Sequence, residues 1–457
     1  MIYNVKDFGA IADGKTLCTK AVQKAVDFCH ENGGGIVRFN RGRYVLSTIF
    51  LKNNVTIEIT KDTEILGAES YYDYAQEEQV DYPIYQDSSH TYYHPSMFVG
   101  IDCENICITG GGKIDMRSVW DEDGVRGEAI KHRGAKCIAL KNCKNIEVSN
   151  LEINNVTDLA IYFAGCENVD IYGIKMRVYI DGISPDNSKN VRIHDCDVET
   201  GDDGIVFKSS YTLNRLDICK DIHVWNCKVK SRCNALKFGT ETNGGFENIL
   251  IENIEIKETR ITGISIESVD GAVIDGITVR NVRMTNVNAP IFVHIGKRMR
   301  GPEGRAIGSI KNVTLENITA SGPYEEYEIM PWNYFSYKAG DTKQNPKVFG
   351  IAESFDGTTE TDEWQMTSNV CGLKESPLEN IVLRNVHLKL DGGVQEYKKE
   401  VPEEAQDYPE VFVYGRILPA KGIYFRHIDG LILDNVTIET YREDTREDFL
   451  LENVKVI

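Results

Sequence analysis

The sequence Asn145-Ile-Glu-Val-Ser-Asn150-Leu151 sets out a pattern that recurs along most of the chain. A turn-forming residue precedes alternating apolar and polar residues, and a second turn-forming residue stands five positions after the first. The next copy is Asn168-Val-Asp-Ile-Tyr-Gly173-Ile174. Further copies begin at Asn190, Asp221, Asn248, Gly276, Asn312, Asn380 and Gly430, with second turn residues at Asp195, Asn226, Asn253, Asn281, Asn317, Asn385 and Asn435.

Each copy predicts a short β-strand with one buried face, because apolar residues alternate with polar ones. Asn, Asp and Gly tolerate the left-handed backbone that a sharp corner requires. Successive copies from Asn145 to Asn312 start 23, 22, 31, 27, 28 and 36 residues apart. A coil of about 22 residues with two or three short strands is typical of a parallel β-helix. We therefore expect an all-β protein with one domain over residues 1–457, whose coils occupy residues 51–457.

Residues 1–50 are expected to form an N-terminal strand and a capping helix. A strand over residues 3–10 is followed by a turn at Asp13-Gly14 and a helix over residues 19–31. One face of this helix carries Ala21, Val22, Ala25, Phe28 and Cys29. Such a helix can cover the open apolar end of a stack of coils.

Long loops are expected where the spacing exceeds one coil, at residues 60–100, 323–376 and 390–420. The middle loop is rich in aromatic residues, namely Tyr324, Tyr327, Trp332, Tyr334, Phe335, Tyr337 and Trp364. Aromatic rings pack against the C–H faces of sugars, so this loop, with Trp332, is a candidate wall of a saccharide-binding cleft. A loop that packs on itself, or a contact between subunits, explains the same residues equally well.

The composition limits the partners of the protein. The 457 residues include 41% hydrophobic residues but no run of 18 apolar ones, so no membrane span is expected. A net charge of −19 disfavours nucleic acid and anionic membranes, and it provides no long-range attraction for a polyanion. A short or weakly charged substrate fits this charge better. No charged and apolar leader precedes Tyr3, which favours a cytoplasmic protein unless a signal has been removed.

The twelve cysteines show no C-x2-C pairs, so they are expected to be reduced, buried side chains rather than metal ligands. Four of them, Cys103, Cys143, Cys166 and Cys219, stand two residues before a first turn residue, and Cys196 and Cys227 follow a second one. These positions predict columns of stacked side chains. Neither a metal nor a cofactor is expected.

Three aspartates stand out within the repeat. Asp202 and Asp203 lie between two glycines, and Asp181 precedes Asp202 by 21 residues, which is close to one coil. Adjacent coils lie about 4.8 Å apart, so the three carboxylates are expected to be neighbours. Their repulsion raises the proton affinity of at least one and leaves another ionised, which supplies an acid and a base. The alternative is a solvated Asp-Gly corner without a catalytic role.

An acid and a base together suit hydrolysis of a glycosidic bond, in which one carboxyl group protonates the leaving oxygen and another activates water. Inverting enzymes keep the two groups roughly 6.5 to 9.5 Å apart to admit the water.

At these residues the chain resembles glycoside hydrolase family 28, the polygalacturonases and their relatives. Tyr179-Ile180-Asp181-Gly182 matches the family's Asn-Thr-Asp-Gly motif, and Gly201-Asp202-Asp203 matches its Gly-Asp-Asp motif. The resemblance implies a right-handed, single-stranded parallel β-helix of the pectin-lyase-like kind and cleavage with inversion. It also implies that Asp202 is the general acid, and that Asp181 and Asp203 hold and deprotonate the water.

The family's substrate-binding motifs are altered in this chain. Its Gly-His-Gly motif falls on Cys233-Asn234-Ala235, and its Arg-Ile-Lys motif falls on Ser265-Ile266-Glu267, which removes both cations. A glutamate in place of a lysine repels an acidic sugar. The expected substrate-binding residues are Asn234, Lys208, Lys237, Glu241, Glu267, His294, Arg298 and Trp332, with the two glutamates available to hydroxyl groups of a neutral sugar. For His294, a packed or hydrogen-bonded histidine is the more common role.

The expected activity is therefore hydrolysis of plant cell-wall, pectin-type oligosaccharides, with removal of terminal residues because long loops block one end of the groove. A polysaccharide lyase and a carbohydrate-binding protein without activity are the two alternatives. A lyase needs a base and commonly calcium, which the three aspartates could hold. Whether the chain forms a homo-oligomer is left open.

Overall fold

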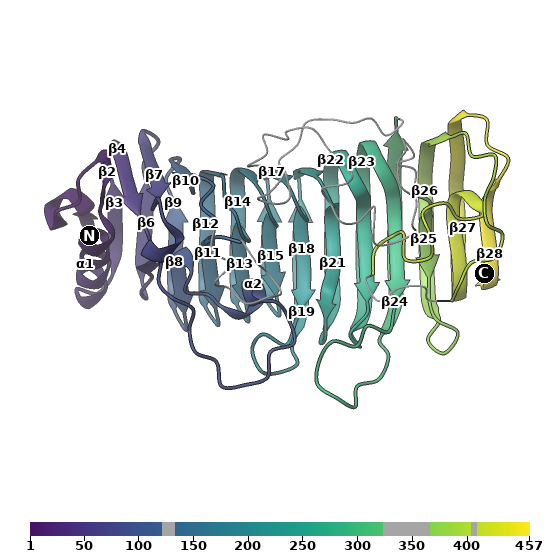
Figure 1. Cartoon of the computed structure of the whole chain (residues 1–457), viewed down its shortest axis with the longest axis horizontal. Coiled ribbons are helices and arrows are strands. Elements are labelled where there is room, and N and C mark those ends of the chain that lie inside the picture. The colour runs from purple at the N-terminus through teal and green to yellow at the C-terminus, as the bar shows by residue number, and fades with distance from the viewer. Residues whose placement is uncertain (121–132, 323–365, 404–408) are drawn as a thin grey trace.

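A computed structural model describes residues 1–120, 133–322, 366–403 and 409–457 of the chain. The coils stack into an elongated rod, with the N-terminus at one end and the C-terminus toward the other (Figure 1). All 28 strands found in these described ranges pair in parallel within this stack, which confirms the predicted parallel β-helix. Neither helix in the described ranges has the length and apolar character needed to span a membrane.

The strands form three faces that run the length of the rod. The first face, called the site face below, contains β5 (Ile49–Phe50), β8 (Ser96–Ile101), β11 (Lys136–Lys141), β13 (Ile161–Ala164), β15 (Ile183–Asp186), β18 (Ile205–Ser209), β21 (Asn234–Thr242) and β25 (Ser368–Cys371). The second face contains β1 (Ile2–Asn4), β3 (Gly35–Phe39), β6 (Val55–Ile59), β9 (Glu104–Thr109), β16 (Lys189–His194) and β19 (Ile218–Trp225). The third contains β2 (Asp13–Leu17), β4 (Gly42–Leu46), β7 (Thr63–Gly67), β10 (Lys113–Asp115), β17 (Asp197–Thr200) and β20 (Lys228–Ser231).

The remaining strands bend around corners and contribute to more than one face or continue the stack toward the C-terminus. They are β12 (Lys144–Asn154), β14 (Glu167–Val178), β22 (Gly245–Ser268), β23 (Val273–Ile295), β24 (Ser309–Ser321), β26 (Leu378–Gly392), β27 (Ala420–Arg442) and β28 (Glu447–Val456). The helices are α1 (Thr19–Glu31) and α2 (Ser88–Thr91), with single 3-10 turns at Val5–Phe8 and Tyr71–Asp73.

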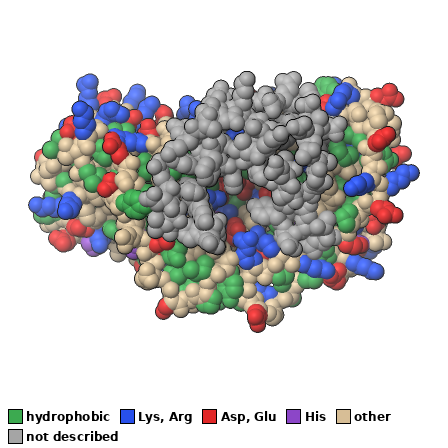
Figure 2. All heavy atoms as spheres, in the orientation of Figure 1, with side chains coloured by type: hydrophobic (Ala, Val, Ile, Leu, Met, Phe, Trp, Pro, Cys, Tyr) green, Lys and Arg blue, Asp and Glu red, His purple; other side chains and the backbone are tan. Residues whose placement is uncertain are grey.

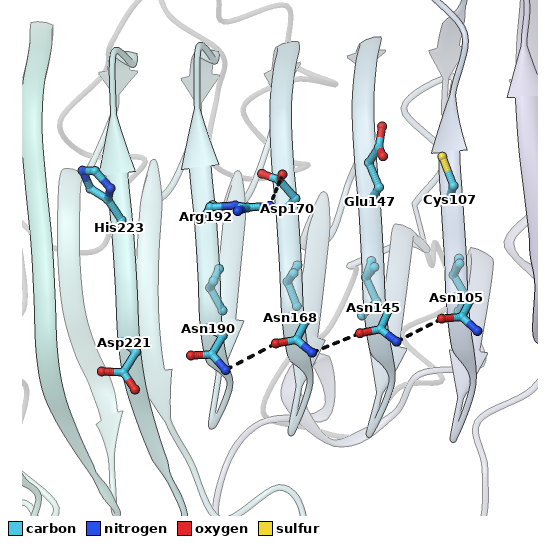
Figure 3. Close-up of a pocket in the computed structure, with 14 residues that line it drawn as sticks. Asn105, Cys107, Asn145, Glu147, Asn168, Asp170, Asn190, Arg192, Asp221 and His223 are labelled. Carbon is cyan, nitrogen blue, oxygen red and sulfur yellow. Dashed lines mark hydrogen bonds and ion pairs between the residues drawn. The ribbon is translucent and has the colours of Figure 1, made fainter.

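The corners of the coils bear out the sequence pattern. Every predicted turn residue has a positive φ, from Asn145 at 54° and Asn150 at 53° to Gly430 at 91° and Asn435 at 55°. The corner asparagines also bond to one another along the rod. The Asn168 Nδ2 atom donates to Asn145 Oδ1 at 3.0 Å, and Asn190 Nδ2 donates to Asn168 Oδ1 at 3.3 Å (Figure 3). The asparagine corners thus combine the left-handed backbone conformation with side-chain bonds that repeat from coil to coil.

Apolar side chains in register fill the interior. Val148 pairs with Ile171, Ile171 with Ile193, and Ile193 with Val224, and all four are fully buried. The cysteines lie in the same stack as free thiols, and all except Cys107 are buried. The Cys166 Sγ atom accepts a bond from the Cys143 amide at 3.4 Å, which agrees with the predicted column of cysteines.

The predicted capping helix agrees with α1, which lies at the N-terminal end of the rod. Its buried residues are Val22, Ala25, Val26 and Cys29. Phe28 was placed on the wrong face, since it is 43% exposed and instead meets the rings of Tyr3 and Phe8.

One expectation for the N-terminus is wrong, and another is met only in part, by Asp13 side-chain bonds and a positive φ at Gly14 within a strand. The strand predicted over residues 3–10 stops at Asn4, because the Asn4 side chain accepts a bond from the Lys6 amide and starts a 3-10 turn. The turn at Asp13-Gly14 lies within β2, where pairing with β4 shifts register.

The loop boundaries also need correction, because strands occupy their ends. Residues 60–100 include β7 and the start of β8, which leaves residues 68–95 as the connection. Strand β25 lies within the range 323–376, and β26 extends to Gly392 within the range 390–420. The aromatic residues predicted to wall a cleft, Trp332 among them, lie outside the described residues.

Substitution of Asn168 tests the corner. Asn168→Gly removes two side-chain bonds and should lower the free energy of unfolding by about 1–2 kcal/mol. Asn168→Ala additionally forces a residue with a Cβ into the left-handed region and should cost about 1 kcal/mol more. Urea denaturation of the two variants measures this difference. Equal losses for both variants would show that backbone conformation does not limit the corner.

Candidate functional site

The three predicted aspartates meet at one corner of the site face. Asp181 lies two residues before β15 and Asp203 two residues before β18, so they occupy equivalent positions in adjacent coils. The Asp203 amide donates to Asp181 Oδ1 at 3.3 Å. One carboxylate oxygen from each of Asp181, Asp202 and Asp203 lies within 4.8 Å of the others. The Asp202 side chain is the most exposed of the three, at 19% against 6% for Asp181 and 9% for Asp203.

Two lysines partly neutralise this cluster. The Lys208 Nζ atom lies 3.5 Å from Asp181 Oδ2 and donates to Glu241 Oε2 at 3.0 Å. The Lys237 Nζ atom lies 3.6 Å from Asp203 Oδ2. Each of the two more buried aspartates therefore has its own ammonium group. Although three carboxylates at this distance could also hold a divalent cation, the lysines already supply positive charge there.

The trio retains a proton more strongly than separate carboxylates do. Burial raises the pKa of Asp181 to about 7, opposed by Lys208 and reinforced by the charges of Asp202 and Asp203. Burial also raises the pKa of Asp203, although Lys237 and the Asn234 amide favour its charged form. Interacting carboxylates titrate as a group, so near neutral pH the trio holds both a proton and a negative charge. The roles of acid and base expected from the spacing stay predictions.

On the C-terminal side of the trio, Lys237 is surrounded by carboxylates. Its Nζ atom donates to Glu410 Oε1 at 2.5 Å and lies 3.7 Å from Glu267 Oε1. Asn234 joins the group, because its Nδ2 atom donates to Asp203 Oδ1 at 2.8 Å and approaches both Glu410 oxygens at 3.3 Å. Burial raises the pKa of Glu410 and brings that of Glu267 to about 8.

Glu410 was not among the residues that the sequence placed at the site. It is 176 positions from Asn234 and belongs to an irregular segment, so no repeat spacing pointed to it.

The sequence also missed a charged group on the N-terminal side of the trio. His90, from α2, bonds through Nδ1 to Asp87 Oδ1 at 2.5 Å, and its Nε2 atom lies 4.0 Å from Glu241. Burial disfavours charge on His90, but Asp87 outweighs this and raises its pKa. Arg133 lies 3.8 Å from Asp202 and 3.9 Å from Asp87. These residues have no periodic pattern that would have indicated them.

Two predicted binding residues, Arg298 and His294, form their hydrogen bonds with residues outside the trio. Arg298 donates to Asp270 and to the hydroxyl and carbonyl of Thr240, so it supports the residue before Glu241. His294 accepts or donates a bond at 3.1 Å with the Tyr414 hydroxyl, and burial lowers its pKa to about 3. It is therefore a neutral, packed histidine. Trp332 falls outside the described residues.

Two segments cover the site face on either side of the trio. Toward the C-terminus, the buried residues Val411, Phe412 and Tyr414 pack against the face. Toward the N-terminus, Tyr93 stacks on Tyr162 with ring centroids 5.6 Å apart. In the space-filling view, acidic and basic side chains lie close together in a hollow over the central strands (Figure 2).

A separate groove of about 800 Å³ lies on the second face, lined by corner residues such as Asn145 and Asn168 and by the charged pair Asp170 and Arg192 (Figure 3). It contains none of the predicted site residues. The trio is thus distinct from this open surface.

The buried carboxylate cluster and its lysine partners, held by a parallel β-helix, form a site suited to acid–base chemistry on a bound sugar. Residues 52–329 match the model of glycosyl hydrolases family 28, and the chain belongs to this family. The family membership and the fold confirm the resemblance stated from the sequence, including the right-handed β-helix.

The chain is 27% identical over 215 residues to a probable polygalacturonase of Vitis vinifera, covering 45% of this chain and 44% of that protein. It is 23% identical over 305 residues to the exo-poly-alpha-D-galacturonosidase of Dickeya chrysanthemi, covering 55% and 50%. These matches span about half the length of the curated relatives. In structure it is similar to an exopolygalacturonase from Thermotoga maritima, with a TM-score of 0.65, 20% identity and coverage of 85% and 87%.

The raised pKa of Glu267 predicts a pH-dependent stability. Between its ordinary pKa near 4.5 and about 8, the unfolded chain loses the proton that the folded protein keeps, so this group lowers stability as pH rises. Glu267→Gln removes the effect. Its melting temperature relative to wild type should therefore increase by several degrees from pH 4.5 to pH 9.

Differential scanning fluorimetry across this pH range measures the difference. Glu379→Gln, which changes an exposed glutamate on β26, is the matched control and should show a constant offset. A constant offset for Glu267→Gln as well would contradict the raised pKa.

Proposed function

We propose that the protein is an inverting glycoside hydrolase that removes terminal residues from plant cell-wall, pectin-type oligosaccharides. The observation that supports this most directly is the trio of Asp181, Asp202 and Asp203, with its retained proton and its two lysine partners. Family membership supports the reaction class.

In this proposal Asp202 is the general acid that protonates the leaving oxygen. It has the most accessible carboxyl group of the trio, which suits contact with a substrate. The Asp202 carbonyl accepts bonds from the hydroxyls of Thr200 at 2.7 Å and Ser231 at 2.6 Å, which fix its backbone. Arg133 stands beside its carboxyl group.

Asp181 and Asp203 hold and deprotonate the water. Both are fixed on two sides: Asp181 by the Asp203 amide and Lys208, and Asp203 by Asn234 and Lys237. Two fixed carboxylates at equivalent positions of adjacent coils suit one water between them. The pKa of Asp181 near 7 suits a base that works near neutral pH.

The separation of the carboxylates also favours a second mechanism. The trio oxygens lie within 4.8 Å of one another, whereas inverting enzymes usually separate acid and base by roughly 6.5 to 9.5 Å and retaining enzymes by roughly 5 to 5.5 Å. The nearest oxygens of the trio are therefore closer together than the separation typical of inverting enzymes. In a retaining enzyme, one aspartate would attack the sugar and form a covalent intermediate. Inversion rests on the residue-by-residue resemblance of the motifs.

Removal of terminal residues is supported by the two segments that cover the site face. Apolar side chains around Phe412 and Tyr93 occupy the face on both sides of the trio, so a long polymer has little open groove to cross it. A site bounded on both sides in this way suits the end of a chain rather than its interior.

The first test is a release assay with short plant oligosaccharides and aryl glycosides, both acidic and neutral. Wild type should free one sugar, and Asp202→Asn should lower turnover by a factor of about 10² or more. Proton NMR of the first product reports the anomer: inversion supports a single displacement, whereas retention supports the covalent route. A variant with most of its activity would remove Asp202 from the acid role, and an unchanged melting temperature excludes misfolding.

A lyase is separated from a hydrolase by its product and by calcium. A hydrolase should give no ultraviolet-absorbing unsaturated sugar, and EDTA should leave its rate unchanged. An ultraviolet-absorbing unsaturated product, together with activity restored by calcium, would instead support the lyase alternative and a cation bound by the trio.

A further inference from the structure

Buried polar atoms without hydrogen-bond partners gather on the C-terminal side of the trio. Four of these atoms, on β21, β22 and β23, carry the argument below: Asn234 Oδ1, Thr262 Oγ1, Glu267 Oε2 and His294 Nε2. All four side chains are buried. They lie in two register pairs, Asn234 beside Thr262 and Glu267 beside His294. Because unpaired buried polar atoms cost free energy, such a group indicates a polar ligand.

The chemistry of these atoms narrows the ligand. Asn234 has its orientation fixed, since Nδ2 is used by Asp203 and Glu410, and its free oxygen only accepts. Glu267 has one oxygen bonded to the Ser265 hydroxyl at 2.6 Å and the other unpaired. His294 is a neutral imidazole with Nδ1 held by Tyr414. Acceptors and neutral groups of this kind match the hydroxyl groups of a sugar.

The cation nearest to Asn234 and Glu267 in the described part of the chain, Lys237, is already engaged by acidic side chains. Lys237 lies among Glu410, Asp203 and Glu267, at 2.5, 3.6 and 3.7 Å. Its positive charge already faces three acidic side chains before any ligand arrives. A uronate would add a fourth carboxylate to this group and meet repulsion.

We propose that these residues bind a sugar without a carboxyl group, recognised through its hydroxyls, next to the bond that is cleaved. This inference rests on the proposed function, since it assigns the substrate class of the same site. The excluded class is a uronic acid residue at this position. The set of Asn234, Glu267, Glu410 and Lys237, rather than any one residue, carries the preference.

Binding measured without turnover tests the assignment. Methyl α-glycosides of galactose, glucose and mannose, and of the three matching uronic acids, are titrated by calorimetry into the Asp202→Asn protein. At least one neutral glycoside should bind tenfold or more tightly than its uronate counterpart. A uronate that binds more tightly than its neutral counterpart, or no binding by any neutral glycoside, would overturn the assignment.

Charge variants in the same background identify the residues responsible. Glu410→Gln keeps the shape of the side chain but releases Lys237 from its nearest carboxylate, so it should shift the preference tenfold or more toward the uronate. Glu267→Lys should shift it further, and Glu267→Gln should shift it less. Glu379→Gln is the exposed control and should change nothing. Unchanged preference in Glu410→Gln, with an unchanged melting temperature, would overturn the role of the charge cluster.

The outcome separates this inference from the proposed reaction. Neutral sugar binding by Asp202→Asn without release by wild type would remove the hydrolase and keep the binding preference. Release of a terminal uronate by wild type would keep the hydrolase and remove the preference.

Discussion

Strict register between adjacent coils is the constraint on which the rest of this molecule depends. Each coil places its side chains about 4.8 Å from the equivalent side chains of the next. For the corner asparagines this repetition is favourable, since each amide donates to the one before it. For Asp181 and Asp203 the same register is unfavourable, since it places two like charges side by side. The repulsion between these two carboxylates, on which the site depends, is therefore a consequence of the fold.

Lysines on the same face reduce this repulsion without removing it. Lys208 and Lys237 each stand near one of the two aspartates, but Lys208 also serves Glu241, and Lys237 also serves Glu410 and Glu267. Carboxylates thus outnumber the ammonium groups in a buried region. Buried ion pairs seldom stabilise a fold in net terms, because desolvation offsets their attraction. The excess of carboxylates is better explained by chemistry and ligand binding than by stability, and it accounts for the raised pKa values of Asp181 and Glu267.

The sequence predicted the parts of the structure that follow from repetition. Corner residues as far apart as Asn145 and Asn435 have the expected left-handed backbone, because the same local chemistry acts in every coil. The juxtaposition of Asp181 with Asp203 follows from the same periodicity. The prediction that Phe28 lies on the buried face was wrong. Helical spacing alone does not show where the rings of Tyr3 and Phe8, which Phe28 contacts, lie around the helix.

The irregular segments were beyond this reasoning. Glu410, His90 and Arg133 reach the site from connections whose paths depend on tertiary packing rather than on a period. Their contacts change the interpretation of residues that the sequence did identify. In the sequence alone, Asn234 only marks the loss of the histidine in the family motif, and Glu267 the loss of its lysine. In the structure Asn234 donates to both Asp203 and Glu410, while Lys237 connects Glu410 to Glu267.

These contacts make the two altered motifs parts of one group held together by hydrogen bonds and ion pairs. A lysine at position 267 would place a second ammonium group beside Lys237, and the Glu410 carboxylate that now compensates one charge would then face two. A histidine at position 234 could not donate from one amide nitrogen to Asp203 and Glu410 as Asn234 does. Because each residue suits the others, the altered set is coherent, which is the property of a site adapted to a different ligand. Decay of a disused site gives no reason for such mutual fit, so the motif changes argue for changed specificity.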